Sequence, residues 1–334
     1  MKATLLGSGL LVAASWSYLR HVQLPVGPSR MHWGELVFGH RGCRFIPSIP
    51  ENTLPAFQYA LDNGANGIEL DVRLSKDNEV VVFHDAYFNQ HMKQTEPTKR
   101  VDQLDLFEIK QLSFECDPTN EVRIPTLEEI ILYCREKQLK MLIEIKELER
   151  PRVCVDKVLE LYRRYPEFMY QETTVIAFSP SVLYNLRSKD KNVAVGQLYS
   201  GEVIHAWVTT GAEKAPAIFA LAPWFFDKIA LIMQSKINPW VTGVSVVCPK
   251  YTLFSPKMRR MWHSRRIAVY CWGFSKPQEC DEEMRTKGVM VACDDRHAEF
   301  ATAKPPPNFD IFGDAERRAE EEANEARRRQ QLSR

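Results

Sequence analysis

The chain has 334 residues, of which 45% are hydrophobic and 26% charged, and its formal net charge is +1. This composition is typical of a globular protein and excludes a collagen-like chain, a disordered chain and a small disulfide-rich protein. A net charge near zero also argues against a general nucleic-acid-binding protein, which normally has an excess of basic residues. The eight cysteines lie far apart without a C-x-x-C pair, so zinc ligation is not expected.

An uncharged apolar run, Ala3–Leu19, lies near the start of the chain and is followed by Arg20. Three interpretations are open: a retained membrane anchor, a cleaved signal peptide, or a buried N-terminal helix. Trp16 and Tyr18 are typical of the interfacial end of an anchor. We therefore favour a retained anchor, which would place the protein on the endoplasmic reticulum or another internal membrane.

Short β-rich runs then alternate with helical patterns, which predicts an α/β fold and favours a TIM (β/α)8 barrel over an open sheet. The predicted strands are Leu36–Phe38, Gly67–Val72, Val80–Phe83, Met141–Ile145, Thr174–Phe178, Ala194–Leu198, Gly243–Val247, Ile267–Cys271 and Val289–Ala292. The predicted helices include Leu54–Asn63, Thr126–Lys137, Val153–Tyr165, Ser181–Ser188, Ser255–Ser264 and Pro277–Lys287. Only the seven residues of Arg73–Glu79 separate the second strand from the third, too few for a crossover helix, so the barrel should be irregular near strands 2 and 3.

Two further segments depart from this alternation. Ala215–Met233 is strongly apolar but is broken by Pro216 and Pro223, so it is either a buried helical insertion or a segment that rests at a membrane interface. After Pro305–Pro307 the chain is rich in Ala, Glu and Arg without an apolar seam, which predicts a charged helical or disordered tail. We therefore expect an anchor and linker over residues 1–30, a barrel domain over residues 31–304 and the tail over residues 305–334.

Seven polar residues follow or end predicted strands, where a parallel barrel collects its catalytic groups; they are His40, Arg41, Glu69, Asp71, His84, Glu144 and Lys146. The three carboxylates, with no thiolate beside them, form a hard, oxygen-rich site suited to one divalent cation, Mg²⁺ or Ca²⁺. The arginine and the lysine would bind a phosphate, and the two histidines would serve as general acid and base. Together these groups indicate cleavage of a phosphodiester.

With these motifs the chain resembles the glycerophosphodiester phosphodiesterase family. The matching segments are HRG at His40–Gly42, ENTLPAF at Glu51–Phe57, GIELDVRLSKDNEVVVFHD at Gly67–Asp85, RIPTLEE at Arg123–Glu129 and IEIK at Ile143–Lys146. The resemblance implies a TIM barrel with a divalent metal on Glu69, Asp71 and Glu144. It also implies His40 and His84 as the acid–base pair, with Arg41 and Lys146 on the phosphate.

Two further site residues and one departure follow from the same resemblance. Asn52, in the ENT motif, is expected to support the His40 loop, and Trp272 in VYCWGF is expected to pack on the glycerol. Family members usually end with T-D-x-P, whereas this chain has VACDDRH, so Asp294 and Asp295 are left without a role.

The N-terminal apolar run and the apolar insertion resemble those of the membrane-associated, lysophospholipase D branch of the family. This resemblance implies release of lysophosphatidic acid and a head-group alcohol from lysophospholipids. Three alternatives stay open: a glycerophosphodiesterase that converts soluble glycerophosphocholine-type substrates into glycerol 3-phosphate, a lyase that stops at the cyclic phosphate, and an inactive barrel that binds lipid or protein.

Overall fold

The computed structural model describes residues 17–294, apart from residues 35, 45, 89–90, 94–97, 203–221, 275 and 281. The apolar run up to residue 16, the first part of the apolar insertion and the tail at residues 305–334 therefore lie outside the described residues.

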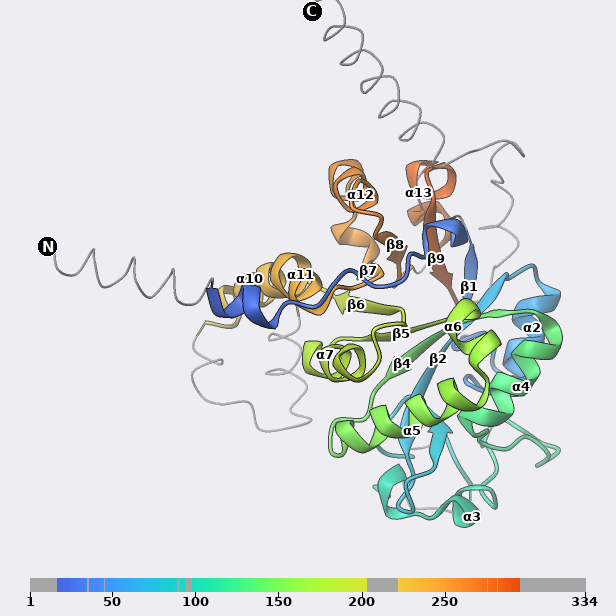
Figure 1. Cartoon of the computed structure of the whole chain (residues 1–334). Coiled ribbons are helices and arrows are strands. Elements are labelled where there is room, and N and C mark those ends of the chain that lie inside the picture. Colours follow the sequence, from blue (N-terminus) through green and yellow to red (C-terminus); the bar gives the residue numbers. More distant parts are fainter. Residues whose placement is uncertain are drawn as a thin grey trace, which may run out of the picture.

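Eight parallel strands close into a barrel within the described part of the chain (Figure 1). Their order around the barrel is β1-β9-β8-β7-β6-β5-β4-β2, and β1 pairs with β2 to close the ring. Their bounds are β1 Val37–His40, β2 Gly67–Leu74, β4 Lys140–Ile145, β5 Thr173–Ala177, β6 Val195–Tyr199, β7 Val246–Pro249, β8 Ala268–Cys271 and β9 Val289–Cys293. The predicted TIM barrel is confirmed.

The predicted irregularity is a hairpin. Strand β3 (Val80–Val82) pairs antiparallel with β2, with Val72 opposite Val82 and Leu74 opposite Val80. A turn in which Ser75 N–H donates to the Glu79 carbonyl closes this hairpin. The short connection therefore returns the chain beside β2 instead of crossing over the barrel.

Helices follow most strands and cover the outside of the barrel (Figure 1). They are α2 Leu54–Asp62, α3 Leu106–Ile109, α4 Leu127–Lys137, α5 Pro151–Arg164, α6 Pro166–Glu172, α7 Pro180–Lys189, α10 Pro223–Ile232, α11 Asn238–Thr242, α12 Pro256–His263 and α13 Glu282–Thr286, with a π-helical turn η3 at Met233–Ile237. The predicted single helix at Pro277–Lys287 is wrong: a 3-10 turn ends at Glu279, whose side chain accepts from Lys276 N–H, and α13 begins separately.

Side-chain alternation along the strands separates an apolar layer inside the barrel from a polar layer at its C-terminal end. The inner core contains Phe38, Leu142, Tyr270 and Ala292, each on a different strand. Because strand side chains alternate with a period of two, the residues two positions further along point inward as well; they are His40, Glu144, Trp272 and Asp294. The polar layer is thus set by strand register.

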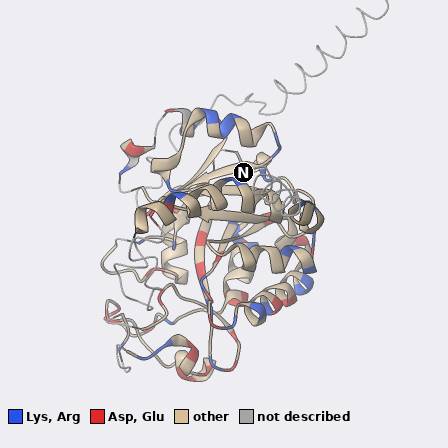
Figure 2. Cartoon of the chain, turned by 90° about the vertical axis from the view of Figure 1, so that its left-hand side faces the viewer, with Lys and Arg blue, Asp and Glu red and all other residues tan. Residues whose placement is uncertain are grey.

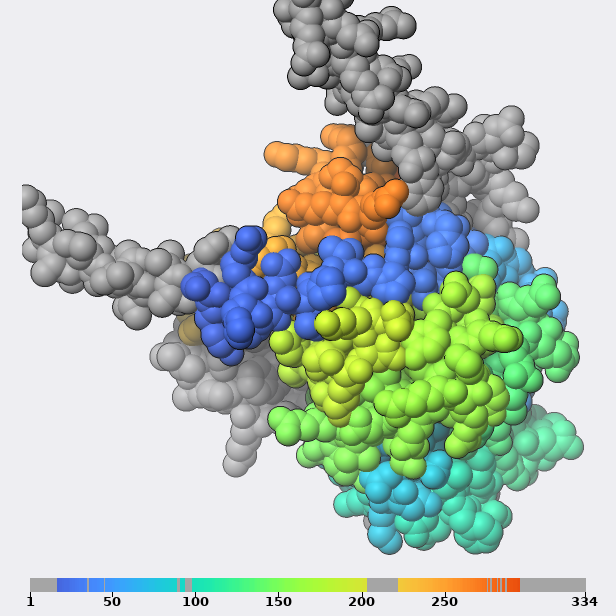
Figure 3. All heavy atoms as spheres, viewed as in Figure 1, coloured from blue at the N-terminus to red at the C-terminus, as the bar shows by residue number. Residues whose placement is uncertain are grey.

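The N-terminal strap, residues 23–30, runs across the outside of the barrel between α7 and α12 and lies within the blue band of Figure 3. Gly27 N–H donates to the carbonyl of Gly243 over 2.8 Å, and the buried Arg187 donates to the carbonyl of Pro25 over 2.6 Å. Gly243 has φ +62°, and a side chain there would collide with the Pro25 carbonyl, so glycine is required on both counts.

At the end of the strap and just after it, Arg30 and Trp33 attach the chain to the bottom of the barrel. Arg30 is 2% exposed and donates to the carbonyl of Thr173, the first residue of β5, over 2.9 Å. Trp33 is 1% exposed and packs on Phe38 inside the barrel, with ring centroids 5.9 Å apart. The segment before β1 is therefore part of the folded domain from the strap onward.

The described part of the apolar insertion is helical, as predicted, and forms α10. Trp224 and Phe225 are 65% and 48% exposed, so neither ring is packed into the barrel. None of the helices within the described residues combines the length and apolar character needed to cross a bilayer.

Candidate active site

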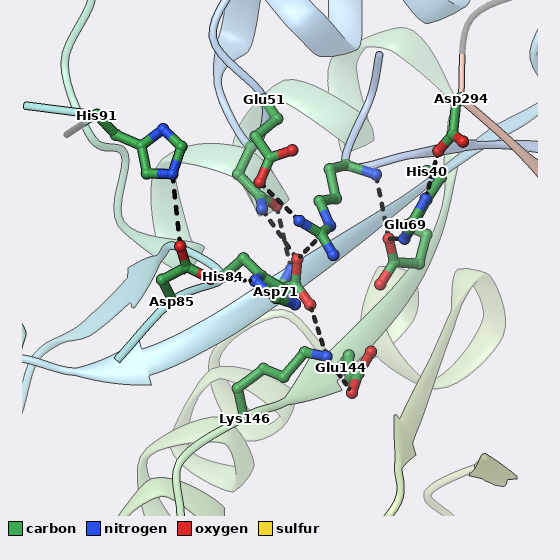
Figure 4. A network of polar contacts seen from close by, with 12 residues as sticks. His40, Glu51, Glu69, Asp71, His84, Asp85, His91, Glu144, Lys146 and Asp294 are labelled. Atoms are coloured by element: carbon green, nitrogen blue, oxygen red, sulfur yellow. Dashed lines mark hydrogen bonds and ion pairs between the residues drawn. The ribbon is translucent and has the colours of Figure 1, made fainter. Parts of the chain in front are cut away.

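Three buried carboxylates form the centre of the polar layer. Glu69 and Asp71 alternate along β2, and Asp71 lies opposite Glu144 in the register of the neighbouring strand β4. One oxygen atom from each side chain lies within 4.8 Å of the other two. Figure 4 shows the three side chains converging between the two predicted catalytic histidines.

The electrostatics of this cluster fit a divalent cation. Burial and the charges of Asp71 and Glu144 raise the pKa of Glu69 well above its usual value, and burial also raises the pKa of Glu144. Burial alone would raise the pKa of Asp71, but Lys146, His84 and other nearby groups lower it to about 2. Mutual repulsion and burial make it unfavourable for all three carboxylates to be ionised unless a cation balances their charge. A set of oxygen donors alone suits Mg²⁺ or Ca²⁺.

Arg41 and Lys146 lie against the carboxylates. Lys146 Nζ is 2.7 Å from Glu144 Oε1 and 3.6 Å from Asp71 Oδ1. Burial would lower the pKa of Lys146, but these two carboxylates raise it overall, so its ammonium stays charged. Arg41 Nη1 is 2.7 Å from Glu51 Oε1, and Arg41 Nε is 3.4 Å from Asp71 Oδ2. Both cations are placed where a phosphate bound to the cluster would meet them.

The turn that follows β1 requires the glycine of the HRG sequence. Arg41 has φ +53° and Gly42 has φ +79°, so two consecutive residues adopt the left-handed conformation. A Cβ on Gly42 would lie 2.6 Å from the carbonyl carbon of Ala56, which leaves no room for a side chain. The turn directs Arg41 N–H to Glu69 Oε2 over 3.1 Å, which fixes one carboxylate of the cluster.

His40 is held by a residue that the sequence left unassigned. Its Nδ1 lies 2.6 Å from Asp294 Oδ1, and its Nε2 faces the cluster, 3.9 Å from Glu69 Oε2. Asp294 directly follows β9, the neighbour of β1, and the inward alternation of Met290 and Ala292 is the signal that could have found it. Asp295, the other aspartate of VACDDRH, lies outside the described residues.

His84 has a corresponding acidic partner on the other side of the cluster. Its Nδ1 lies 2.6 Å from Asp85 Oδ1, and Asp85 Oδ2 is 3.4 Å from His91 Nε2 (Figure 4). Burial lowers the pKa of His84 although the hydrogen bond to Asp85 opposes this, whereas the same aspartate raises the pKa of the more exposed His91. His91 comes from the insertion after β3, and sequence reasoning gave no signal for it.

The two supporting residues also lie at this end of the barrel. Asn52 donates to Asp71 Oδ2 over 2.9 Å and accepts from Asp71 N–H, while its own N–H donates to the Arg41 carbonyl over 2.9 Å. It therefore joins the loop after His40 to the carboxylate cluster. Trp272 packs edge-on against Phe178, with ring centroids 5.6 Å apart, and forms an apolar wall beside Lys146.

Comparison with known proteins agrees with this geometry. The glycerophosphoryl diester phosphodiesterase family matches residues 40–296. The chain belongs to this family. Its reaction is therefore the hydrolysis of a glycerol phosphodiester, which makes the protein a phosphoric diester hydrolase.

Curated relatives agree with this assignment, and solved structures share the fold. Glycerophosphodiester phosphodiesterase 1 of Bos taurus is 27% identical over 244 residues, covering 70% of each chain. The glycerophosphodiester phosphodiesterase of Caldanaerobacter subterraneus subsp. tengcongensis is 29% identical and covers 61% of this chain and 84% of its own. A phosphodiesterase of Oleispira antarctica, solved in complex with the product sn-glycerol-3-phosphate, has the same fold, with a TM-score of 0.60 at 17% identity, covering 83% of this chain and 99% of its own.

Proposed function

We propose that the protein is a metal-dependent lysophospholipase D that works at a membrane surface and releases lysophosphatidic acid and a head-group alcohol from lysophospholipids. The phosphodiester chemistry follows from the family. The lipid substrate is supported by one observation, the exposed apolar face of α10.

This face consists of large apolar side chains that stay exposed among the residues that the structure describes. Trp224 is 65% exposed, Phe225 48%, Ile229 44% and Ile232 56%. Contiguous exposed apolar residues on a helix are typical of a surface that meets lipid or another protein. Figure 2 shows that α10 and α11 carry few charges, whereas Lys and Arg gather on α12 near the top of the view.

The position of the N-terminal segment favours lipid as the partner. Residues 17–22 are helical, and Leu19 lines a cavity together with Tyr184, Met233 and Ile237, which lie on α7 and η3. The apolar run Ala3–Leu19 therefore ends beside the turn that continues α10. If the residues before Leu19 form an anchor, α10 would be brought close to the surface of the endoplasmic reticulum or another internal membrane.

In the mechanism that we propose, the chain supplies binding, positioning and proton transfer. A divalent cation on Glu69, Asp71 and Glu144 would supply Lewis-acid stabilisation of charge on the phosphate. Arg41 and Lys146 bind the phosphoryl oxygens and stabilise the charge that develops on them.

The two histidines carry the protons. One histidine takes the proton from the free glycerol 2-hydroxyl, whose oxygen then attacks phosphorus, and the other donates a proton to the departing head-group oxygen. Water then opens the resulting cyclic phosphate. Direct attack by water on phosphorus is the alternative route to the same products.

The test compares two substrates that share a head group and differ in the acyl chain. We expect kcat/KM to be higher for lysophosphatidylcholine than for glycerophosphocholine, because burying Trp224 and Phe225 against lipid stabilises the complex by about 1.5 to 3 kcal/mol per ring. The double variant Trp224→Ala, Phe225→Ala should reduce this preference at least ~10-fold while sparing glycerophosphocholine.

Phe107→Ala is the matched control, because Phe107 is 76% exposed on the separate helix α3. If glycerophosphocholine is the better substrate and the double variant leaves the ratio unchanged, the soluble-substrate glycerophosphodiesterase replaces the lysophospholipase D. If purified protein with Mg²⁺ or Ca²⁺ cleaves neither substrate, the proposed function is contradicted and the inactive, binding barrel becomes the alternative.

A further inference from the structure

We propose that a cavity beside His84 receives the departing head group and selects a cationic amino alcohol of the choline or ethanolamine type. This inference rests on the proposed function, because it assigns the part of the substrate that the phosphodiester cleavage releases.

The cavity, called here the head-group cavity, has a volume of about 350 Å³ and adjoins the catalytic layer directly. His84 and Asn52 line it, and Asn52 is hydrogen-bonded to Asp71 of the carboxylate cluster. These two residues lie between the cavity and the carboxylate cluster, so a group joined to a phosphate on that cluster would be next to the cavity. This volume lies within the range of small-molecule binding sites and is much larger than the space that a single water molecule occupies.

The direction of the cavity indicates which half of the substrate enters it. In an in-line displacement at phosphorus, the attacking and departing oxygens lie on opposite sides. Phe178 and Trp272 form the apolar wall on one side, next to Lys146, and α10 follows β6 on that side of the barrel. That side suits the glycerol and the acyl chain. The head-group cavity, on the His84 side, is then left for the departing alcohol.

The chemistry of the cavity suits a positive charge. Carboxylates of Glu51, Asp85 and Glu115 line it, against one arginine, Arg44, and the imidazole of His91. Glu51 is paired with Arg41, and Asp85 is bonded to the two histidines. Glu115, by contrast, forms no ion pair with any residue in the described part of the chain, so its charge is available to a ligand.

Aromatic side chains complete this environment. Phe83 and Phe114 line the same cavity and are 6% and 4% exposed, so they are held in fixed positions by the core of the insertion. An ammonium group gains from aromatic faces and from a nearby carboxylate together. The serine head group also has an ammonium, but its carboxylate would be repelled by Glu115, and a neutral alcohol would gain less.

The experiment uses the full-length protein and a panel of glycerophosphodiesters that differ only in the head group. We expect choline and ethanolamine substrates to exceed the glycerol and inositol ones in kcat/KM by about 10-fold, and Glu115→Gln to reduce this advantage by about 5-fold, in line with a partly exposed ion pair. Glu115→Lys should shift the preference toward the serine substrate. Glu121→Gln, which removes an exposed carboxylate of the same insertion outside the cavity, is the control and should change neither value.

Free choline serves as a second probe that does not depend on turnover of any one substrate. It should inhibit the wild-type protein competitively and inhibit Glu115→Gln more weakly. Equal kcat/KM for all head groups, with no effect of either Glu115 variant, would overturn the inference while leaving the phosphodiesterase intact. Failure to cleave any member of the panel would instead contradict the proposed function itself.

Discussion

Asp294 does not face the substrate itself but positions His40 through a hydrogen bond. The variant Asp294→Asn should therefore slow the reaction without removing a group that touches the substrate. The hydrogen bond to His40 Nδ1 is 2.6 Å long and joins a carboxylate to an imidazole. A hydrogen bond to a charged group contributes about 1.5 to 3 kcal/mol, which corresponds to a ~10-fold to ~150-fold loss of kcat. The variant keeps the size of the side chain, so its thermal unfolding should stay close to that of the wild type.

A double-mutant cycle tests the reasoning behind this number. Because residues that act as a unit are not additive, Asp294→Asn should cost less than ~2-fold in a His40→Ala background. Asp85→Asn is the matched comparison, because Asp85 holds the other histidine and should still slow the His40→Ala variant. The cycle is read from steady-state kcat on one glycerophosphodiester. Equal losses from Asp294→Asn in both backgrounds would show that it does not act through His40.

Three further outcomes are expected. EDTA should abolish activity, and adding Mg²⁺ or Ca²⁺ should restore it; full activity in excess EDTA would contradict the metal site. At 100 times its Kd the metal should also raise the free energy of unfolding, measured in thermal melts, by about 2.7 kcal/mol. The Glu69→Gln variant should not show this stabilisation. His40→Ala and His84→Ala should each lower kcat by ~10²–10⁴-fold with unchanged circular dichroism, and near-normal turnover would remove that histidine from the mechanism. Burial and Arg259 lower the pKa of His263 from 6.5 to about 4, so the unfolded chain binds the proton first as the pH falls. Stability should therefore drop by up to about 3 kcal/mol between pH 6.5 and pH 4, and urea unfolding of His263→Gln should show a smaller drop.

The carboxylates and the strands could be predicted from the sequence because both depend on a period of two. Glu69 and Asp71 share a face of one strand, and Glu144 and Lys146 share a face of another, whatever the rest of the chain does. The irregularity near β2 and β3 could be predicted as well, since the connecting segment is too short to cross the barrel, whereas its form, an antiparallel hairpin, is a finding of the structure.

The acidic partners of the histidines could not be predicted in the same way. The alternation of Met290 and Ala292 favours Asp294 over Asp295 as the inward-facing residue, but only if β9 keeps its register as far as residue 294, which the departing motif VACDDRH does not determine. The contact of His91 with Asp85 depends on how the insertion after β3 folds. The exposure of Trp224 could not be predicted either. When apolar residues occur on all sides of a helix, the sequence pattern does not indicate which side faces solvent and which side faces the protein.

The N-terminal strap has a mechanical consequence for whatever the preceding residues bind. Its hydrogen bonds reach α7 through Arg187 and the first residue of β5 through Arg30. The strap is therefore a rigid connection to the barrel and not a flexible linker. A chain held at residues 17–22 would impose a nearly fixed orientation on the barrel, because the strap begins at the next residue. Inserting glycine and serine between residues 22 and 23 would free the barrel to rotate, whereas the same insertion after residue 30 would separate the strap from β1 within the fold.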